Sequence, residues 1–261
     1  MQPGRALITG ASKRLGREMA LYLAAQGWDI AVHYASSKEA AQALVGEIRA
    51  MGPAACALQA DLLEEDAAQA LVPQAAEALG GPLTLLINNA SIFENDSLQS
   101  ATRASWDRHL ESNLRAPFVL IQNFAAQAPK AGTDKRGEPL ARALVINMLD
   151  QRIHKLTPAF MSYTIAKMGL WALTQTAARA MAPDIRINGI GPGPTLQGAR
   201  QSDAHFARQR AATVLERGSN PEDITAALGY FLSADGVTGQ MLCTDGGQHL
   251  GWQTPDILGQ E

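Results

Sequence analysis

Short apolar segments of four to eight residues alternate with longer segments of helical periodicity along the whole chain. The short segments are residues 6–9, 29–34, 54–59, 83–88, 140–147, 185–190 and 240–243, and we predict that each is a β-strand. Between them, apolar residues recur at helical spacing in residues 15–26, 39–51, 64–79, 105–128, 160–181 and 221–232. Helices of this length between strands favour right-handed crossovers. The pattern therefore predicts an α/β fold, a doubly wound parallel sheet with helices on both faces.

Three segments fall outside this alternation. Residues 131–138 are polar and rich in Gly and Lys, which is typical of a surface loop. Residues 191–219 have weaker periodicity and are the candidate for a mobile lid over a substrate. Residues 249–261 show no clear pattern and are expected to form a tail. We therefore predict a single domain over residues 1–248.

Composition and charge exclude several classes of protein. The chain has 261 residues, of which 46% are hydrophobic and 18% charged, and its net charge is −3 with no basic cluster. Nucleic acid is therefore not an expected partner. No apolar run is long enough to cross a membrane, and the first residues lack the apolar region of a signal peptide. Cys56 and Cys243 lie in strand-like segments, as buried thiols of a reducing compartment do, so we expect a cytoplasmic protein.

A turn suited to phosphate binding joins the first strand to the first helix. Residues 9–16 read Thr-Gly-Ala-Ser-Lys-Arg-Leu-Gly, with Arg14 where such turns often carry a middle glycine. A turn of this kind directs backbone N–H groups at a pyrophosphate on the helix N-terminus. The alternative is that the glycines serve tight packing alone.

The end of the second strand bears on the choice of dinucleotide. No acidic residue follows it to bind a ribose 2′-hydroxyl, whereas Ser36 and Ser37 follow it directly. Together with Lys13 they favour a 2′-phosphate and hence NADPH, although the two serines are equally suited to cap the next helix. Asp61, after the third strand, is a candidate acceptor for an adenine amino group or another helix cap.

The candidate catalytic residues are Tyr163 and Lys167, with Asp150 thirteen residues before the tyrosine. A Tyr and a Lys at i and i+4 share one helix face. The ammonium group is expected to lower the pKa of the phenol and to hold a cofactor hydroxyl, so that the phenol donates a proton near neutral pH.

With these motifs in order, the chain resembles the short-chain dehydrogenase/reductase family along essentially its whole length. The matching pieces are Thr9 to Gly16, Asp61, Asn88-Asn89-Ala90, Asn113, Tyr163 with Lys167, Arg186-Ile187-Asn188, Gly191-Pro192-Gly193, Thr238-Gly239 and Asp245-Gly246-Gly247. The resemblance implies a Rossmann-type enzyme that transfers hydride with a nicotinamide cofactor, usually as a homotetramer or dimer. It also implies that Asn113 holds a water molecule that links Lys167 to solvent.

Within the family the chain looks most like the pteridine reductases and the bacterial dihydromonapterin/dihydrofolate reductases of this fold. Pteridine reductases also replace the catalytic serine by aspartate. The residues that carry this likeness are 13–16, 33–34, 89–93 and 146–150. In those enzymes an arginine of the glycine turn and an aromatic residue flank the pterin; here these are Arg14 and Phe93. The alternatives are that Phe93 is plain core and that Asp150 forms a surface pair with Arg152.

The chemistry of a pterin suits an aspartate better than that of a ketone does. A serine hydroxyl donates to the oxygen of a carbonyl under reduction, whereas an ionised carboxylate only accepts and would repel it. The ring N–H and amino groups of a pterin are donors that a carboxylate receives well. Reduction of its C=N bond also needs a proton, which Tyr163 or a protonated Asp150 would relay while Phe93 stacks on the ring.

The resulting assignment has three parts. The catalytic residues are Asp150, Tyr163, Lys167 and Asn113, and the substrate residues are Arg14, Ser91, Phe93, Asp150 and Tyr163. The residues assigned to NADPH are Gly10, Ser12, Lys13, Arg14, Leu15, Gly16, His33, Tyr34, Ser36, Ser37, Asp61, Leu62, Asn89, Ala90, Ser91, Met148, Tyr163, Lys167, Pro192 and Gly193. No metal site is assigned, because His154, His205 and His249 lack ligand spacing.

Three functions remain open from the sequence. The first is an NADPH-dependent reductase of a pterin-like substrate, in the dihydropterin or dihydrofolate class. The second is a carbonyl reductase acting on a 3-oxoacyl thioester or another ketone. The third is a cofactor-binding sensor without turnover, against which the intact Tyr163, Lys167 and Asn113 set argues.

Overall fold

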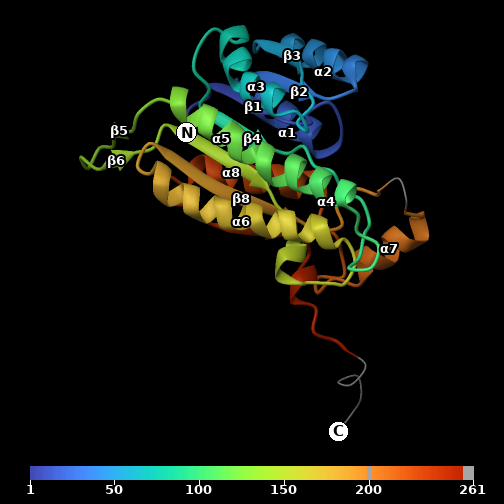
Figure 1. The fold of residues 1–261 in the computed structure, drawn as a ribbon. Helices are drawn as coiled ribbons and strands as arrows, with labels where there is room; N and C mark the ends of the chain where they lie inside the picture. The colour runs from blue at the N-terminus through green and yellow to red at the C-terminus, as the bar shows by residue number, and fades with distance from the viewer. Residues whose placement is uncertain (199–200, 255–261) are drawn as a thin grey trace.

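The computed structural model describes residues 1–198 and 201–254 and confirms the predicted parallel sheet. Its seven strands lie in the order β3-β2-β1-β4-β7-β8-β9, and every pairing between them is parallel (Figure 1). Their bounds are β1 (Arg5–Ile8), β2 (Asp29–Tyr34), β3 (Ala55–Gln59), β4 (Leu85–Asn88), β7 (Ala143–Met148), β8 (Ile185–Pro192) and β9 (Met241–Thr244). All seven predicted strands are therefore present.

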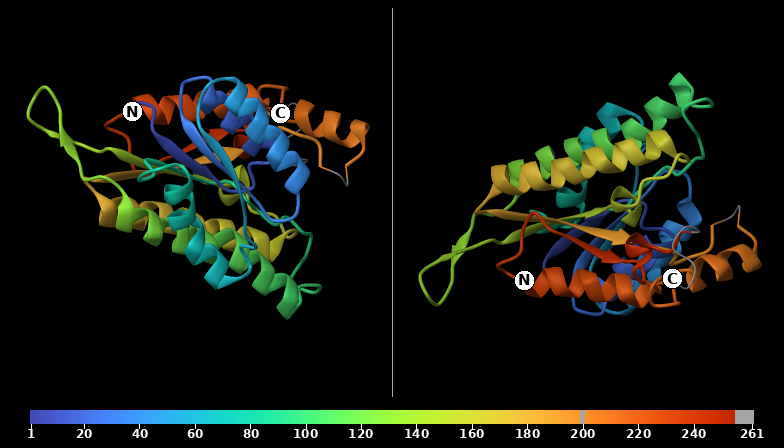
Figure 2. Two further views of the ribbon diagram at one scale, coloured as in Figure 1. Left: turned by 90° about the horizontal axis from the view of Figure 1, so that it is seen from above. Right: turned by 90° about the horizontal axis from the view of Figure 1, so that it is seen from below.

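Helices cover both faces of the sheet, as expected for a doubly wound fold (Figure 2). One layer contains α1 (Arg14–Ala24), α2 (Lys38–Ala50) and α8 (Pro221–Ser233), and the other contains α3 (Glu65–Ala78), α5 (Ala116–Gln127) and α6 (Met161–Met181). Alternate strand residues enter opposite cores, so that Ala6 and Ile8 pack in the first layer and Leu7 in the second. The position of a residue along its strand therefore determines which of the two helix layers its side chain contacts.

The predicted long helix over 105–128 is present over 103–127, but it contains a π-helical turn. It consists of α4 (Arg103–Leu110), a π-helical turn η1 (Glu111–Arg115) and α5. Turns of this kind are rare and frequently occur at functional sites. The π-helical turn contains Asn113, which is fully buried.

The three irregular segments hold more structure than the sequence predicted. Residues 131–138 are not a simple loop, because β5 (Gly132–Thr133) and β6 (Pro139–Leu140) make a short antiparallel hairpin that projects from the body (Figure 1). The predicted lid contains α7 (Asp203–Ala211), and the predicted tail contains the turn η3 (Gln248–Leu250). Residues 199–200 of the lid and 255–261 of the tail lie outside the described residues. The mobility of the lid stays a prediction.

The strand order creates one crevice at the carboxyl edge of the sheet. From β1 the chain moves outward through β2 and β3, and then returns to place β4 on the other side of β1. The helices that follow β1 and β4 therefore pack on opposite faces of the sheet, which leaves a crevice between the ends of the two strands. Ligands of open α/β sheets bind at such a point. Within the described residues, no helix is long and apolar enough to cross a membrane.

Candidate active site

Two glycines shape the turn between β1 and α1. Gly10 has a φ of +60°, and a Cβ there would lie 3.1 Å from the Cα of Ala90. A Cβ on Gly16 would lie 2.5 Å from the carbonyl oxygen of Gly10. Both glycines are therefore required for packing, and the same packing leaves the first turn of α1, with its unpaired N–H groups, facing the crevice.

The turn is tied to the neighbouring strand by Thr9 and Asn89. The Thr9 hydroxyl oxygen accepts hydrogen bonds from the N–H groups of Asn89 and Ala90, both at 2.9 Å. The Asn89 amide in turn donates to the carbonyl of Thr9 at 2.8 Å. The segments after β1 and β4, which the sequence assigned to one cofactor, are thus brought together.

The side chain of His33 on β2 supports the turn through two hydrogen bonds. Its Nδ1 accepts the N–H of Gly10 at 3.0 Å, so Nε2 carries the proton and donates to the carbonyl of Ala60, also at 3.0 Å. Burial lowers the pKa of His33, which keeps the ring neutral, as these two bonds require. The ring is buried among protein groups, so His33 positions the turn, whereas the sequence assigned it to cofactor contact.

The segment after β2 leaves its hydroxyl groups available. Ser36 and Lys13 are exposed, and Ser37 occupies the N-cap position of α2 without a side-chain capping bond. The alternative that the Ser37 side chain serves as a cap is therefore wrong. Asp61 accepts the N–H of Leu63 at 3.0 Å, whereas the N-cap of α3 is Glu64, so Asp61 orders the loop before that helix.

Asp150 and Tyr163 meet in the crevice. The Tyr163 hydroxyl donates to Oδ2 of Asp150 at 2.9 Å, and Oδ1 of Asp150 accepts the backbone N–H of Arg152 at 2.8 Å. The predicted alternative of a surface pair is wrong, since Asp150 bonds to the backbone of Arg152 and forms no ion pair with its guanidinium in the described part of the chain.

The pKa of Tyr163 shifts in the direction opposite to the prediction. Burial and the negative charge of Asp150 raise the pKa of the phenol well above its usual value. The Lys167 ammonium, expected to lower it, donates to the carbonyl of Met148 at 2.7 Å and lies 5.7 Å from the centre of the phenol ring. The phenol therefore keeps its proton and shares it with a carboxylate whose own pKa is raised by burial.

Lys167 is itself unusual because it is almost fully buried and forms no ion pair with an acid of the described residues. Burial lowers the pKa of its ammonium to about 8, although the charge of Asp150 opposes the shift. Its charge is thus present at neutral pH and is lost in mildly alkaline solution. The predicted proximity of the catalytic pair is confirmed, with Lys167 one helical turn after Tyr163 on α6.

A buried polar network that the sequence did not predict holds the start of α6. The Nε2 of His109 accepts the N–H of Glu94 at 3.1 Å, and its Nδ1 therefore donates to the Ser162 hydroxyl at 2.7 Å. The Ser162 hydroxyl donates to Asp96, which also accepts the Ser162 N–H at 3.1 Å. These three side chains are less than 4% exposed. They fix the residue immediately before Tyr163.

Asn113 contributes through the neighbouring loop. Its side-chain amide accepts the N–H of Ile92 at 2.9 Å and donates to the carbonyl of Ile92 at 2.8 Å. Both ends of the amide are therefore used to hold the segment that carries Ser91 and Phe93. The water molecule predicted at Asn113 stays a prediction.

A cavity of about 920 Å³ opens beside Asp150. It is lined by Arg14, Phe93, Asp150, Gln151, Arg152, Phe160, residues 192–194, Leu196, Gly198, Gln201, His205, Phe206, Gln209 and Gln248. Phe93 is 44% exposed, so the alternative that it is plain core is wrong. Its ring packs edge-on against Tyr163 at 4.7 Å and stacks on Phe160 at 4.3 Å.

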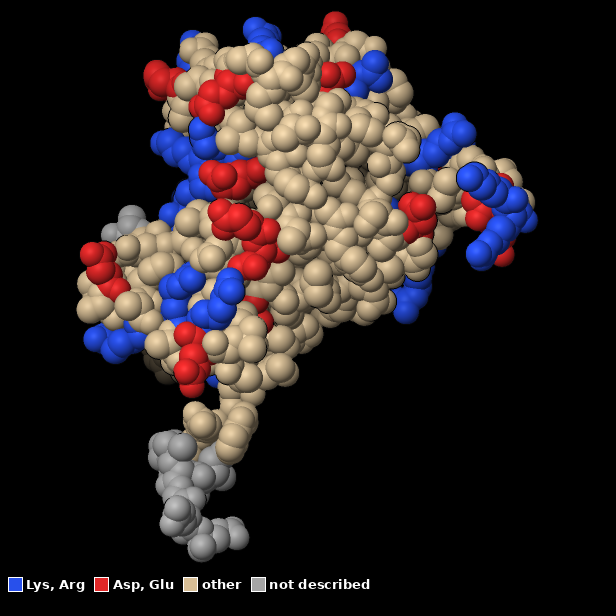
Figure 3. Space-filling view, turned by 180° about the vertical axis from the view of Figure 1, so that it is seen from behind, with Lys and Arg blue, Asp and Glu red and all other residues tan. Residues whose placement is uncertain are grey.

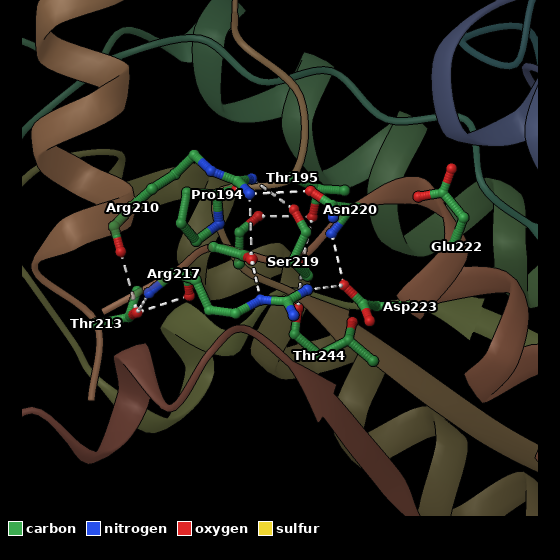
Figure 4. Close-up of polar contacts among 12 residues, drawn as sticks. Pro194, Thr195, Arg210, Thr213, Arg217, Ser219, Asn220, Glu222, Asp223 and Thr244 are labelled. Carbon is green, nitrogen blue, oxygen red and sulfur yellow. Dashed lines mark hydrogen bonds and ion pairs between the residues drawn. The ribbon is translucent and has the colours of Figure 1, made fainter. Parts of the chain in front are cut away.

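The predicted lid is anchored at two places. The Arg14 guanidinium donates to the carbonyls of Leu196 and Gln197 at 3.1 and 2.9 Å. At the base of the lid, Arg210 donates to the carbonyls of Pro194 and Ser219 at 2.9 and 2.6 Å (Figure 4). The two ends of the segment are thus clamped together, and α7 between them has no buried residue.

A doubly wound sheet with a phosphate-binding turn and a buried Tyr-Lys pair at its crevice is the arrangement of a dinucleotide-dependent oxidoreductase. The chain belongs to the short-chain dehydrogenase/reductase family, since a family model described as enoyl-(acyl carrier protein) reductase matches residues 10–249. The 3-oxoacyl-(acyl-carrier-protein) reductase FabG of Staphylococcus aureus is 30% identical over 250 residues, which cover 94% of this chain and 98% of that protein.

Two solved structures of proteins named FolM are similar to this chain over nearly its whole length. FolM alternative dihydrofolate reductase 1 from Brucella suis, in complex with NADP, is 40% identical with a TM-score of 0.89, covering 97% of this chain and 98% of that one. The corresponding protein from Brucella canis, complexed with NADP, is 38% identical with a TM-score of 0.88, covering 98% of both chains.

The network behind Tyr163 predicts a specific effect of Ser162→Ala. Removal of the hydroxyl leaves His109 and Asp96 without their shared partner, so the first turn of α6 shifts and kcat should fall about tenfold. In a Tyr163→Phe background the same change should cost little more, because the network acts through the phenol. Steady-state kinetics of the four proteins check this cycle, and fully additive losses would contradict it.

The pKa of Lys167 predicts the alkaline limb of the pH profile. Its charged form is the protonated one and its pKa is lowered, so kcat/KM should decline as the pH rises through about 8. Lys167→Arg keeps its charge in this range and should shift the decline to higher pH, even if its rate is lower. Profiles from mildly acidic to strongly alkaline pH test this, and an unshifted limb in the arginine variant would disprove it.

Proposed function

We propose that the protein is an NADPH-dependent reductase of a pterin-like substrate, in the dihydropterin or dihydrofolate class. The observation that carries the proposal is the carboxylate of Asp150, held 2.9 Å from the Tyr163 hydroxyl beside an aromatic cavity. In that place a ketone reductase needs a donor for its developing oxyanion, whereas a carboxylate is an acceptor.

The carboxylate retains the capacity to bind a ring edge. Each of its oxygens accepts one hydrogen bond, from Tyr163 and from the Arg152 backbone, and each has a second lone pair. Ring N–H and amino groups would use these positions. Phe93, exposed to the cavity, supplies a flat surface for stacking.

Several observations support NADPH as the reductant. The glycine cradle of the turn, the first turn of α1 and the uncommitted hydroxyls of Ser36 and Ser37 suit a dinucleotide with a 2′-phosphate. The similar FolM structures are complexes with NADP. When bound, the cofactor supplies the hydride.

The chain's own residues supply the proton. Tyr163 has a raised pKa and remains protonated, and Asp150, whose pKa is also raised, accepts a hydrogen bond from it. The pair therefore shares a proton beside the bond to be reduced, and it can release one to a ring nitrogen. Lys167 at neutral pH carries the charge that a cofactor hydroxyl would meet.

The relatives support two substrates to different degrees. FolM, a dihydrofolate reductase by name, is 40% identical, whereas FabG, a ketone reductase by name, is 30% identical. A carbonyl reductase is therefore the second candidate. A sensor without turnover is disfavoured, because it has no need of the intact proton donor Tyr163 and its buried support.

We also propose a cytoplasmic homotetramer. Phe118, Ile165 and Met168 expose apolar surface on α5 and α6. On the opposite face, where α8 lies, few charged side chains occupy the centre, and Tyr230 and Leu242 are exposed (Figure 3). Two separate apolar faces support two interfaces, as a tetramer of dihedral symmetry requires. The cysteines Cys56 and Cys243 are free thiols, which supports a reducing compartment.

The segment after β2 predicts cofactor preference. NADPH should bind at least tenfold more tightly than NADH, because charge-assisted hydrogen bonds to a phosphate each contribute roughly 1.5–3 kcal/mol. The combined change Ser36→Ala and Ser37→Ala should weaken NADPH and leave NADH, which lacks the phosphate, unaffected. Fluorescence titration of both nucleotides decides this. Equal affinities in the unmodified protein would refute the assignment.

Asp150 predicts how substrate preference changes. Asp150→Ser should lower kcat/KM for a dihydropterin about ten- to a hundredfold, because a charge-assisted hydrogen bond is lost. The same change restores a donor, so reduction of an acetoacetyl thioester should be unharmed or improved.

The control is Asp150→Asn, which keeps the size of the side chain and removes its charge. It should impair the pterin reaction as Asp150→Ser does, because the charge is lost, and its amide N–H can donate, so reduction of the thioester should again be unharmed. If the unmodified protein prefers the ketone, or if Asp150→Ser leaves the pterin rate unchanged, the carbonyl reductase is the correct function.

A further inference from the structure

The charges that line the cavity are unbalanced. Among its described lining residues, Arg14 and Arg152 are cationic and Asp150 is the one acid. The remaining lining is aromatic, aliphatic or neutral polar, with His205 on α7. A cavity with more positive than negative charge favours a ligand that brings negative charge to it.

Of the two arginines, Arg14 is already committed. Both of its terminal nitrogens donate to lid carbonyls, and its backbone belongs to the phosphate-binding turn. A dinucleotide phosphate on that turn would supply further negative charge near it. Arg152 is therefore the cation that is left for a substrate.

The Arg152 guanidinium is directed away from Asp150. Although only two residues separate them, Asp150 accepts from the backbone N–H of Arg152, and the guanidinium donates instead to the Thr157 hydroxyl at 2.7 Å. Its centre lies 5.0 Å above the ring of Phe160. The charge is thus held in a fixed position on the aromatic side of the cavity; it acts on Asp150 through space but forms no ion pair with an acid of the described residues.

The guanidinium also retains unused donor capacity. Its Nη1 donates to Thr157, whereas Nη2 makes no hydrogen bond to the described residues and is left to donate; the Nε is buried and cannot be reached from the cavity. Stacking on Phe160 and the bond to Thr157 pre-order the side chain. A planar guanidinium pre-ordered in this way suits a carboxylate, which it can bind through two hydrogen bonds.

A row of aromatic rings connects Arg152 with the reacting centre at Tyr163. From Tyr163 the rings of Phe93 and Phe160 follow in contact, and Arg152 lies on Phe160. A substrate ring at Tyr163 and Asp150 would therefore extend its other end along these rings toward Arg152. The cavity of about 920 Å³ is near the upper limit for small-molecule sites, which leaves room for such an extension.

We propose that Arg152 binds a carboxylate at the end of the substrate remote from its reacting ring. The enzyme would accordingly prefer a pterin conjugated to a glutamate tail, such as dihydrofolate, over an uncharged dihydropterin. This inference rests on the proposed pterin reductase function, and it assigns Arg152 the selection of substrate rather than a step of the reduction.

The first test compares two substrates in three proteins. The readout is the ratio of kcat/KM for dihydrofolate to kcat/KM for an uncharged dihydropterin. Arg152→Met keeps an apolar contact with Phe160 and should lower this ratio about tenfold, as expected for loss of one charged hydrogen bond. Lys155→Met, which removes an exposed cation outside the cavity lining, should leave the ratio unchanged.

Two outcomes of this test would overturn the proposal. The first is an unchanged ratio in Arg152→Met, because the charge of Arg152, which lowers the pKa of Asp150, would then affect both substrates equally through the catalytic carboxylate. The second is an equal fall of the ratio in Lys155→Met, because the effect would then be general electrostatic attraction.

A second test does not depend on reduction of a pterin. Binding of p-aminobenzoylglutamate and of its uncharged diamide to the protein–NADP complex is measured by calorimetry. The acid should bind at least tenfold more tightly than the diamide, and Arg152→Met should abolish this difference. Equal binding of the two probes contradicts the anion site. If instead both pterins fail as substrates while the acid binds selectively, the proposed function fails and the carboxylate site stands.

Discussion

The hydrogen bond between Tyr163 and Asp150 is the constraint on which the rest of the site depends. A carboxylate in a largely buried crevice is stable only where donors surround it, and here the phenol and one backbone N–H supply them. Burial and the same carboxylate raise the pKa of the phenol, so the proton stays within the pair. Burial raises the pKa of Asp150, and the positive charges of Arg152 and Lys167 oppose this rise. The chemistry of the site follows from this balance of charges.

The fold could be predicted closely because it depends on local pattern. Each strand is a short apolar segment buried on both faces, and each core helix places its apolar residues at helical spacing. The elements that the sequence did not predict lack such an apolar pattern. Helix α7 buries no residue, so no apolar stripe marks it, and the π-helical turn at 111–115 differs from an α-helix only in its hydrogen bonds. The hairpin at 132–140 is short and polar.

The candidate site could be predicted only where its residues directly follow strands or share one helix face. Ser91, Asp150 and the glycines meet those conditions. The network of Asp96, His109 and Ser162 does not, because its members come from a loop and two helices that only the folded chain brings together. The wrong sign for the pKa of Tyr163 has a related cause. The prediction rests on Lys167, whereas burial and the charge of Asp150, which lies on another element and accepts the phenol hydrogen bond, determine the shift.

Two residues with a strained backbone line the cavity beside Asp150. Of the three non-glycine residues with positive φ in the described chain, two are Arg14 and Phe160, with φ of 55° and 58°. Such a conformation costs on the order of 1–3 kcal/mol and persists only where other contacts stabilise it. Arg14 is held by its bonds to the lid, and Phe160 by its stacking between Phe93 and Arg152. Both strained residues thus carry a side chain that lines the cavity. The backbone is therefore strained at the two positions that provide a cation and a flat ring to the cavity. A cation and a flat ring are the groups expected around a planar, anionic substrate.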